Sequence, residues 1–353
     1  MDKHSKIYLA GHTGLVGSAL HRRLKTEGFT NIITRELSEL DLTNQKAVNE
    51  FFEKEKPEYV LLAAAKVGGI MANSTYPADF IYQNIMIASN VINASYKNGV
   101  KKLLNLGSSC IYPRLAPQPM KEDSLLTSEL ESTNEAYAIA KISAIKLCRY
   151  YNEQYGTNFI SVMPTNQYGQ GDNYNMETAH ILPMLLRRFH LAKLLRENDF
   201  ESIKKDIKRF KLGWGLDEKL NDDNIEQILN EIGAYKDKAV VWGDGSVFRE
   251  LMYSDDLADA CLYLMQNKNY SEIGELVNIT DGTDIQLKNL FGIVKNIVGY
   301  EGDIVYDKTK PNGTPRKLMD ATKIKALGWS PKTKLEDGIK KAYEWYLGET
   351  YVK

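Results

Sequence analysis

The chain has 353 residues, of which 43% are hydrophobic and 26% charged, and this composition excludes disordered and collagen-like proteins. Lys and Arg total 45 against 46 Asp and Glu, so the net charge of −1 argues against a nucleic-acid partner. Three widely spaced cysteines favour neither a disulfide framework nor a metal cage. No apolar run approaches the roughly 18 residues of a membrane span, and residues 1–9 show no signal-peptide pattern. We therefore expect a globular cytoplasmic protein without a membrane or nucleic-acid partner.

Short apolar runs alternate with longer amphipathic stretches through the first half of the chain. The pattern predicts strands at 6–10, 31–34, 59–65, 102–106 and 159–163, and helices at 15–25, 44–54, 79–97 and 135–155. Repeated βαβ units require a parallel sheet with helices on both faces. The expected fold class is therefore α/β, a doubly wound Rossmann sheet.

The alternation becomes irregular after Pro164. We expect an NADP(H)-binding domain over 1–165, with segments near 240–265 returning to it, and a smaller α/β substrate lobe over 166–353. Further helices are predicted at 180–195, 200–210, 224–232, 254–265 and 287–298, and further strands at 240–242, 275–279 and 303–306. The highly charged stretch 197–237 carries one basic and one acidic helix, which could lie against each other.

A glycine-rich turn follows the first strand and opens the first helix, with the spacing G-x-x-G-x-x-G. Glycines at Gly11, Gly14 and Gly17 let the turn tighten and let backbone N–H groups approach a pyrophosphate, which the helix N-terminus also attracts. The alternative is a tight turn without a ligand. The strand–turn–helix context favours a dinucleotide site, whose candidate residues are Gly11, Thr13, Gly14, Leu15, Val16 and Gly17.

The segment after the second strand should meet the adenosine ribose. Arg35 suits the 2′-phosphate of NADP, whereas the adjacent Glu36 suits the free hydroxyl of NAD, so this signal is mixed. Asp41 and Leu42 could contact the adenine edge, or Asp41 could simply cap the following helix.

A tyrosine and a lysine lie four residues apart on one face of a predicted helix. The cation of Lys141, together with an oxidised nicotinamide, should favour the phenolate of Tyr137 and bring its pKa of about 10 towards neutrality. Ser108 ends the fourth strand, at the sheet edge where ligands bind. Together these residues resemble the Ser–Tyr–Lys triad of the short-chain dehydrogenase/reductase superfamily.

Longer motifs narrow the resemblance. They include AAAKVGGI at 63–70, LGSSCIYP at 106–113, SVMPTN at 161–166 and LPMLLRRFH at 182–190. These resemble GDP-L-fucose synthase, the GDP-4-keto-6-deoxy-mannose 3,5-epimerase/4-reductase. The resemblance implies NADP(H) as cofactor and a GDP-4-keto-sugar as substrate. It also implies reduction by Ser108, Tyr137 and Lys141, with Cys110 and His180 as the base and acid of epimerisation.

The same resemblance supplies candidate binding residues. For the cofactor it adds Ala63, Ala64, Ala65, Pro164, Asn166 and His180 to the glycine turn and the triad. For the substrate it indicates Val67, Ser108, Ser109, Cys110, Asn166, Arg188, Trp242, Arg249 and Lys317. Alternative interpretations remain open: Cys110 as a packed thiol, Arg187, Arg188 and Arg249 as surface charges, and Trp242 as a core residue. The resemblance further implies a homodimer formed through the helices 79–97 and 135–155.

Three departures from the family pattern bear on specificity. Thr13 and Leu37 stand where the family typically has arginines, and the stretch 197–237 is longer than its counterpart. This insertion could reshape the sugar pocket or be a surface elaboration. An alternative function is therefore a C4 reductase without epimerase activity that acts on a GDP-4-keto-heptose. A non-catalytic cofactor-sensing protein is a remote alternative, because such proteins usually lose the Tyr or the Lys.

Overall fold

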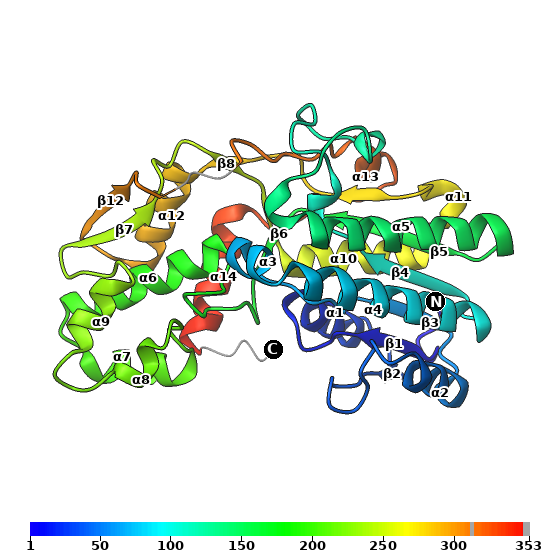
Figure 1. Ribbon diagram of the computed structural model, residues 1–353, viewed down its shortest axis with the longest axis horizontal. Coiled ribbons are helices and arrows are strands. Elements are labelled where there is room, and N and C mark those ends of the chain that lie inside the picture. Colours follow the sequence, from blue (N-terminus) through cyan, green and yellow to red (C-terminus); the bar gives the residue numbers. More distant parts are fainter. Residues whose placement is uncertain (311–313, 349–353) are drawn as a thin grey trace. The chain divides into compact units, whose positions relative to one another are not determined.

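A computed structural model describes residues 1–310 and 314–348, which form two compact units (Figure 1). Unit 1 comprises residues 1–167, 250–283 and 318–333. Unit 2 takes the described residues of 168–249, 284–317 and 334–353. Among the residues described, no helix combines the length and apolar character that crossing a bilayer requires.

Unit 1 is built on a six-stranded sheet with the order β10-β5-β4-β3-β1-β2, in which every neighbouring pair is parallel. The strands are β1 (Ile7–Ala10), β2 (Ile32–Ile33), β3 (Tyr59–Leu62), β4 (Lys102–Leu106), β5 (Phe159–Pro164) and β10 (Val277–Ile279). The predicted Rossmann α/β fold is confirmed.

Alternating side chains of each strand supply two hydrophobic cores, one on each face of the sheet. Ile7 and Leu9 pack in one core and Tyr8 and Ala10 in the other, as the period of two in a strand requires. The first core includes residues of α1 (Leu15–Thr26) and α10 (Ser254–Asn267), which pack together. The second includes residues of α2 (Gln45–Glu55), α4 (Pro77–Lys97) and α5 (Glu135–Tyr155). The smaller helices are α3 (Ile70–Thr75), α11 (Tyr270–Ile273) and α13 (Thr322–Ala326).

One strand lies elsewhere than expected. We predicted 275–279 as part of the smaller lobe, but β10 pairs with β5 through Val277 and Val162 and so extends the large sheet. All three residues of β10 are buried, which suits a strand covered on both faces.

Unit 2 contains two small sheets and a group of helices. In the first sheet β7 (Lys238–Trp242) pairs in parallel with β12 (Asp303–Asp307), and in the second β8 (Phe248–Arg249) pairs antiparallel with β11 (Ile285–Gln286). The long helices are α6 (Ile181–Arg196), α12 (Leu287–Val298) and α14 (Leu335–Leu347). Two further short strands lie outside these sheets: β9 (Leu251–Tyr253) belongs to unit 1, and β6 (Asn166–Tyr168) begins in unit 1 and ends in unit 2.

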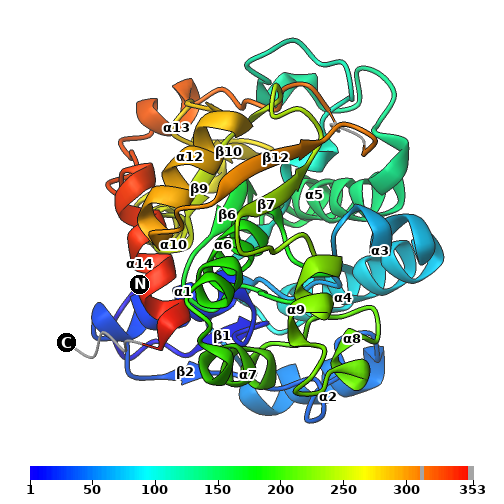
Figure 2. The same cartoon turned by 90° about the vertical axis from the view of Figure 1, so that its left-hand side faces the viewer.

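The charged segment 197–237 forms three helices, α7 (Phe200–Arg209), α8 (Leu216–Lys219) and α9 (Ile225–Glu231). Figures 1 and 2 show them in green near α6, and both α7 and α9 pack against α6. Apolar side chains such as Ile203 and Ile228 are buried beneath the charged surface. The segment is thus anchored by a hydrophobic face, and one of its charged side chains, Asp206, is only 7% exposed.

Candidate active site

The glycine turn at the end of β1 is tightly packed at two of its three glycines. Gly11 has a φ of +84°, and a Cβ there would lie 2.6 Å from the backbone nitrogen of Ala64. A Cβ on Gly17 would lie 1.9 Å from the carbonyl oxygen of Gly11. Both positions therefore require glycine for internal reasons.

The third glycine differs from the other two. A Cβ on Gly14 would make only an ordinary contact at 3.7 Å, and Gly14 is exposed where it caps α1. No acidic residue occupies the first turn of α1, and the buried Nδ1 of His12 has no hydrogen-bond partner within the chain. An open helix N-terminus with unused donors fits a pyrophosphate, so the turn suits a dinucleotide.

A shallow hollow of about 570 Å³ is lined by Thr13, Glu36, Leu37 and Ser38, where the adenosine ribose was expected. Asp41 accepts hydrogen bonds from the backbone and hydroxyl of Thr43, so it caps a turn rather than α2, which Asn44 caps. Leu42 is buried in the second core.

The loop after β3 carries Ala63, Ala64, Ala65 and the exposed Val67. Asn84 fixes this loop: its Oδ1 accepts from the Lys66 backbone at 2.9 Å and its Nδ2 donates to the Lys66 carbonyl at 3.0 Å. Asn73 donates to the carbonyl oxygens of Gly68 and Gly69. These two buried asparagines, which sequence reasoning did not single out, hold the loop in shape.

The predicted triad residues come from neighbouring elements of unit 1. Ser108 follows β4 and its Oγ accepts from the Cys110 backbone at 3.4 Å, which begins the short 3-10 helix Ser109–Ile111. This short helix packs against α5, which carries Tyr137 and Lys141. The ammonium of Lys141 lies 5.7 Å from the centre of the Tyr137 ring and donates to the Leu106 carbonyl at 2.8 Å.

Burial shifts the pKa values of the two triad residues on α5 in opposite directions. Burial, with the Cys110 charge adding to it, raises the pKa of Tyr137 well above its usual value of 10. Burial lowers the pKa of Lys141 to about 8. Desolvation therefore dominates the pKa of Tyr137 in the protein alone. The expectation that Lys141 and an oxidised nicotinamide together lower this pKa concerns the cofactor-bound enzyme and stays a prediction. The neutral phenol is the form that can donate a proton.

Other candidate residues lie at the end of β5 or in unit 2. Pro164 ends β5 and Asn166 is exposed, with its amide donating to the Glu250 carbonyl at 3.1 Å. His180 is exposed and caps the N-terminus of α6 through its backbone in unit 2, whereas Cys110 and Ser109 are buried in unit 1.

Arg188 on α6 is a buried cation in unit 2, not a surface charge. It is 3% exposed, its Nη1 donates to the Val240 carbonyl at 2.8 Å, and its Nε has no hydrogen-bond partner. Among the described residues no carboxylate pairs with it, and burial lowers its pKa to about 10. A desolvated guanidinium with a free donor is a suitable group for binding a phosphate.

The remaining candidates in unit 2 surround β7 and β8. Trp242 is 50% exposed, with the Lys310 ammonium 5.6 Å from its ring, so it is not a core residue. Arg249 is half-buried and donates to the carbonyl oxygens of Phe248 and Thr314, each at 2.7 Å. Lys317 is also partly buried.

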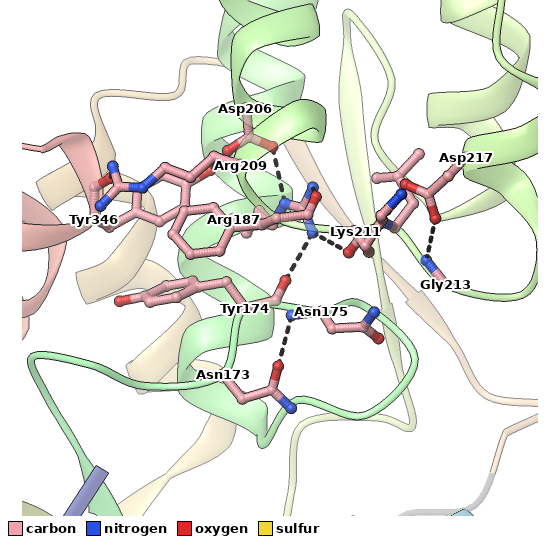
Figure 3. A network of polar contacts seen from close by, with 12 residues as sticks. Asn173, Tyr174, Asn175, Arg187, Asp206, Arg209, Lys211, Gly213, Asp217 and Tyr346 are labelled. Atoms are coloured by element: carbon pink, nitrogen blue, oxygen red, sulfur yellow. Dashed lines mark hydrogen bonds and ion pairs between the residues drawn. The ribbon is translucent and has the colours of Figure 1, made fainter. Parts of the chain in front are cut away.

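Sequence reasoning missed two buried acids and misjudged Arg187. Burial raises the pKa of Asp172 to about 7 and that of Glu250 to about 8. Arg187, which could have been a surface charge, is completely buried in the network of Figure 3. Local sequence gives little signal for these residues, because their burial depends on distant segments.

Comparison with known proteins agrees with this geometry. The model of the NAD dependent epimerase/dehydratase family matches residues 7–205 and 214–280. A putative GDP-L-fucose synthase of Arabidopsis thaliana is 51% identical over 98% of this chain and 93% of that protein.

Two solved structures are also similar along the whole chain. A GDP-6-OMe-4-keto-L-xylo-heptose reductase from C. jejuni is 42% identical with a TM-score of 0.91, covering 99% of each chain. MlghC, a GDP-mannoheptose C4 reductase from Campylobacter jejuni with NADP bound, is 43% identical with a TM-score of 0.87, covering 98% of this chain and 99% of its own. The chain therefore belongs to the NAD dependent epimerase/dehydratase family and, within it, to the GDP-L-fucose synthase family.

Proposed function

We propose that this protein reduces the C4 ketone of a GDP-4-keto-6-deoxy-sugar with NADPH, after epimerisation at C3 and C5. The observation that carries the proposal is the Tyr137 phenol beside the Lys141 ammonium on a helix that packs against the Ser108 segment. The proposed cofactor residues lie almost entirely in unit 1 and most of the proposed GDP residues in unit 2. We therefore propose that unit 1 binds the cofactor and unit 2 the nucleotide of the substrate.

In the reduction, bound NADPH would supply the hydride to C4, and the glycine turn with Gly11, Gly14 and Gly17 would hold its pyrophosphate. Tyr137 donates the proton to the forming alkoxide, and its raised pKa keeps the phenol protonated for this step. The Lys141 cation then stabilises the phenolate left behind, and the Ser108 hydroxyl donates a hydrogen bond to the same substrate oxygen.

In the epimerisation, the 4-keto group acidifies the protons at C3 and C5, since the carbanion is delocalised as an enolate. We assign the removal and return of these protons to Cys110 and His180. Ser108 and Tyr137 stabilise the enolate oxygen by hydrogen bonds.

Arg188, with Arg249 and Lys317, would bind the diphosphate of GDP, and Trp242 offers an exposed face for the guanine.

A second candidate function is reduction of a GDP-4-keto-heptose without epimerisation. The two similar reductases of 42% and 43% identity favour it, because both are named for heptose substrates and one is named as a C4 reductase. Under this alternative Cys110 and His180 are retained without catalysing proton exchange.

Product analysis by NMR separates these functions. GDP-4-keto-6-deoxy-mannose and its heptose counterpart are each incubated with enzyme and NADPH in D2O. Deuterium at C3 and C5 that disappears in Cys110→Ser supports the bifunctional enzyme, whereas reduction without deuterium uptake identifies the reductase. If NADPH is oxidised with neither of the two sugars, both functions are contradicted.

The Tyr137→Phe variant tests the proton donor. We expect its reduction rate to fall by at least about 100-fold, since a general acid contributes roughly that much or more. The control Tyr150→Phe removes an exposed hydroxyl from the same helix and should retain full activity. Cofactor binding, followed by NADPH fluorescence, should be unchanged in both variants; unaltered turnover in Tyr137→Phe would exclude the assignment.

We also propose that the protein is a homodimer that works in the cytoplasm. Helices α4 and α5 pack together and expose the aromatic side chains of Tyr82, Tyr96, Tyr150 and Tyr155. Such a surface is suited to a partner chain, and light scattering would give the mass. The buried Cys110, Cys148 and Cys261 form no disulfide among the described residues, which suits a reducing compartment.

A further inference from the structure

The hollow beyond the glycine turn has an unusual charge for an NADP enzyme. Its lining residues are Thr13, Glu36, Leu37 and Ser38, which include one carboxylate and no basic side chain. Glu39 lies close by, since its carboxylate accepts from the Glu36 backbone at 2.7 Å. A dianionic 2′-phosphate in this hollow would meet negative charge without a compensating cation from the lining.

The basic residue nearest in sequence, Arg35, is already engaged. Its Nη2 lies 2.9 Å from Oε1 of Glu55, and its Nη1 donates to the Thr34 carbonyl at 2.8 Å. The guanidinium also lies 5.5 Å from the centre of the Phe51 ring. These contacts come from α2 and from the strand-end backbone, so they fix Arg35 from more than one side.

Glu55 is itself held in place. Its other carboxylate oxygen lies 3.2 Å from the Lys6 ammonium, which also donates to the Glu55 carbonyl at 2.6 Å. The Glu55 side chain is only 18% exposed. Glu55 is therefore held by Lys6 while it pairs with Arg35, and an Arg35 side chain that turns towards a phosphate would weaken this ion pair.

We propose that Glu55 sets the preference of this enzyme between NADPH and NADH, by holding Arg35 in an ion pair that competes with the 2′-phosphate. The inference rests on the proposed function in assuming that NADP(H) occupies the glycine turn. It makes Glu55 a specificity-determining residue that acts through Arg35. The consequence is an enzyme with a weak preference for NADPH and measurable use of NADH.

The test measures binding without the sugar substrate. Isothermal titration gives the affinities of 2′,5′-ADP, which carries the 2′-phosphate, and of 5′-ADP, which lacks it. We expect Glu55→Gln to raise the affinity for 2′,5′-ADP about threefold to fivefold, the size of effect typical of a partly exposed ion pair, and to leave that for 5′-ADP unchanged. The matched control is Glu53→Gln, which removes an exposed carboxylate from the same helix and should change neither affinity.

Two further variants keep the outcome clear if Glu55→Gln disturbs folding. Leu37→Arg places a cation in the hollow at a 77% exposed position, and it should raise 2′,5′-ADP affinity in the presence of Glu55. Arg35→Met should remove the gain seen in Glu55→Gln but change the wild-type affinity less than threefold. A folded Glu55→Gln protein with an unchanged ratio of the two affinities would overturn the proposal. So would a loss of more than tenfold in Arg35→Met alone, because Arg35 would then already bind the phosphate.

These outcomes are independent of the proposed reaction. If neither 5′-ADP nor 2′,5′-ADP binds, the cofactor assignment fails and the inference fails with it. If both bind but no GDP-sugar is reduced, the proposed function fails while the effect of Glu55 can still be measured. The ratio of NADPH to NADH turnover in wild type and Glu55→Gln then extends the result to the active enzyme.

Discussion

Arg187 and Arg188 are adjacent on α6 and both are buried, yet their surroundings differ completely. Arg187 is 0% exposed, and its Nε pairs with Asp206 at 2.9 Å. Its Nη1 donates to the carbonyl oxygens of Tyr174 and Lys211 (Figure 3). Its Nη2 donates to the carbonyl oxygen of Phe210. Arg188 has a single carbonyl acceptor, a contact to the Met184 sulfur and an unpartnered Nε.

The difference shows how a buried charge can be assigned to stability or to binding. The network around Arg187 joins three segments: Asp206 comes from α7, and the Tyr346 hydroxyl of α14 donates to the same carboxylate (Figure 3). Four of the five N–H donors of Arg187 bind Asp206 or carbonyl oxygens of the chain, and the side chain is fully buried, so Arg187 serves the packing of the chain rather than a ligand. Arg188 carries the cost of desolvation without a counter-charge, which an anionic ligand would offset.

Of the variants that test this comparison, Arg187→Met should have the largest effect, and the effect should be on the free energy of unfolding. Removing the cation leaves the Asp206 carboxylate buried with only the Tyr346 hydroxyl, and breaking a buried pair in this way costs about 3–5 kcal/mol. We expect the free energy of unfolding, measured by urea denaturation, to fall by that amount. If stability is unchanged and only GDP affinity falls, the division between the two arginines is wrong.

Arg188→Met should have the opposite profile. The variant removes a buried charge that has no carboxylate partner, so the free energy of unfolding should change by less than about 1 kcal/mol. GDP affinity, measured by calorimetry, should weaken by about 2 kcal/mol, roughly 30-fold, because charge-assisted hydrogen bonds to the diphosphate are lost. A severe loss of stability with intact GDP binding would show that Arg188 stabilises the fold and does not bind GDP.

Lys141 extends the comparison to a third buried cation and should show the smallest effect. Its pKa is about 8 in the folded protein against 10.5 when exposed, so the unfolded chain binds more protons between these values and wild-type stability rises with pH there. The free-energy cost of burying the charged Lys141 is fully present below about pH 8 and disappears above about pH 10.5. Relative to Lys141→Met, wild type should therefore gain roughly 1–2 kcal/mol of unfolding free energy between pH 7.5 and 9.5. A constant difference across this range would show that Lys141 is not desolvated in the folded protein.

The local sequence pattern predicted most of unit 1, because each strand and helix of a βαβ unit shows its own hydrophobic periodicity. The predicted helix 135–155 matches α5, and the predicted strand 102–106 matches β4. The glycine turn could also be recognised, since the requirement at Gly11 and Gly17 comes from neighbours within the same motif. The prediction that 275–279 belongs to the smaller lobe was wrong. The pairing of β10 with β5 joins residues more than 100 positions apart, which a local pattern does not show.

The site could be predicted less completely for a related reason. The spacing of Tyr137 and Lys141 fixes their proximity on one helix, but the direction of the Tyr137 pKa depends on burial by other segments. Likewise, nothing adjacent to Arg187 distinguishes it from Arg188, since Asp206 and Tyr346 lie on other helices. Which of two neighbouring arginines is paired is a property of the packed structure.

The threading of the chain has a consequence for its synthesis. Unit 1 needs residues 318–333 in addition to its first 167, and unit 2 includes residues beyond 333. The strand β10, which closes one edge of the large sheet, is made more than 100 residues after β5. During translation the ribosome therefore releases an incomplete sheet with an exposed hydrophobic edge for many seconds, at elongation rates of about 5–20 residues per second. Chaperones that shield such an edge should bind the nascent chain up to the point at which β10 has emerged.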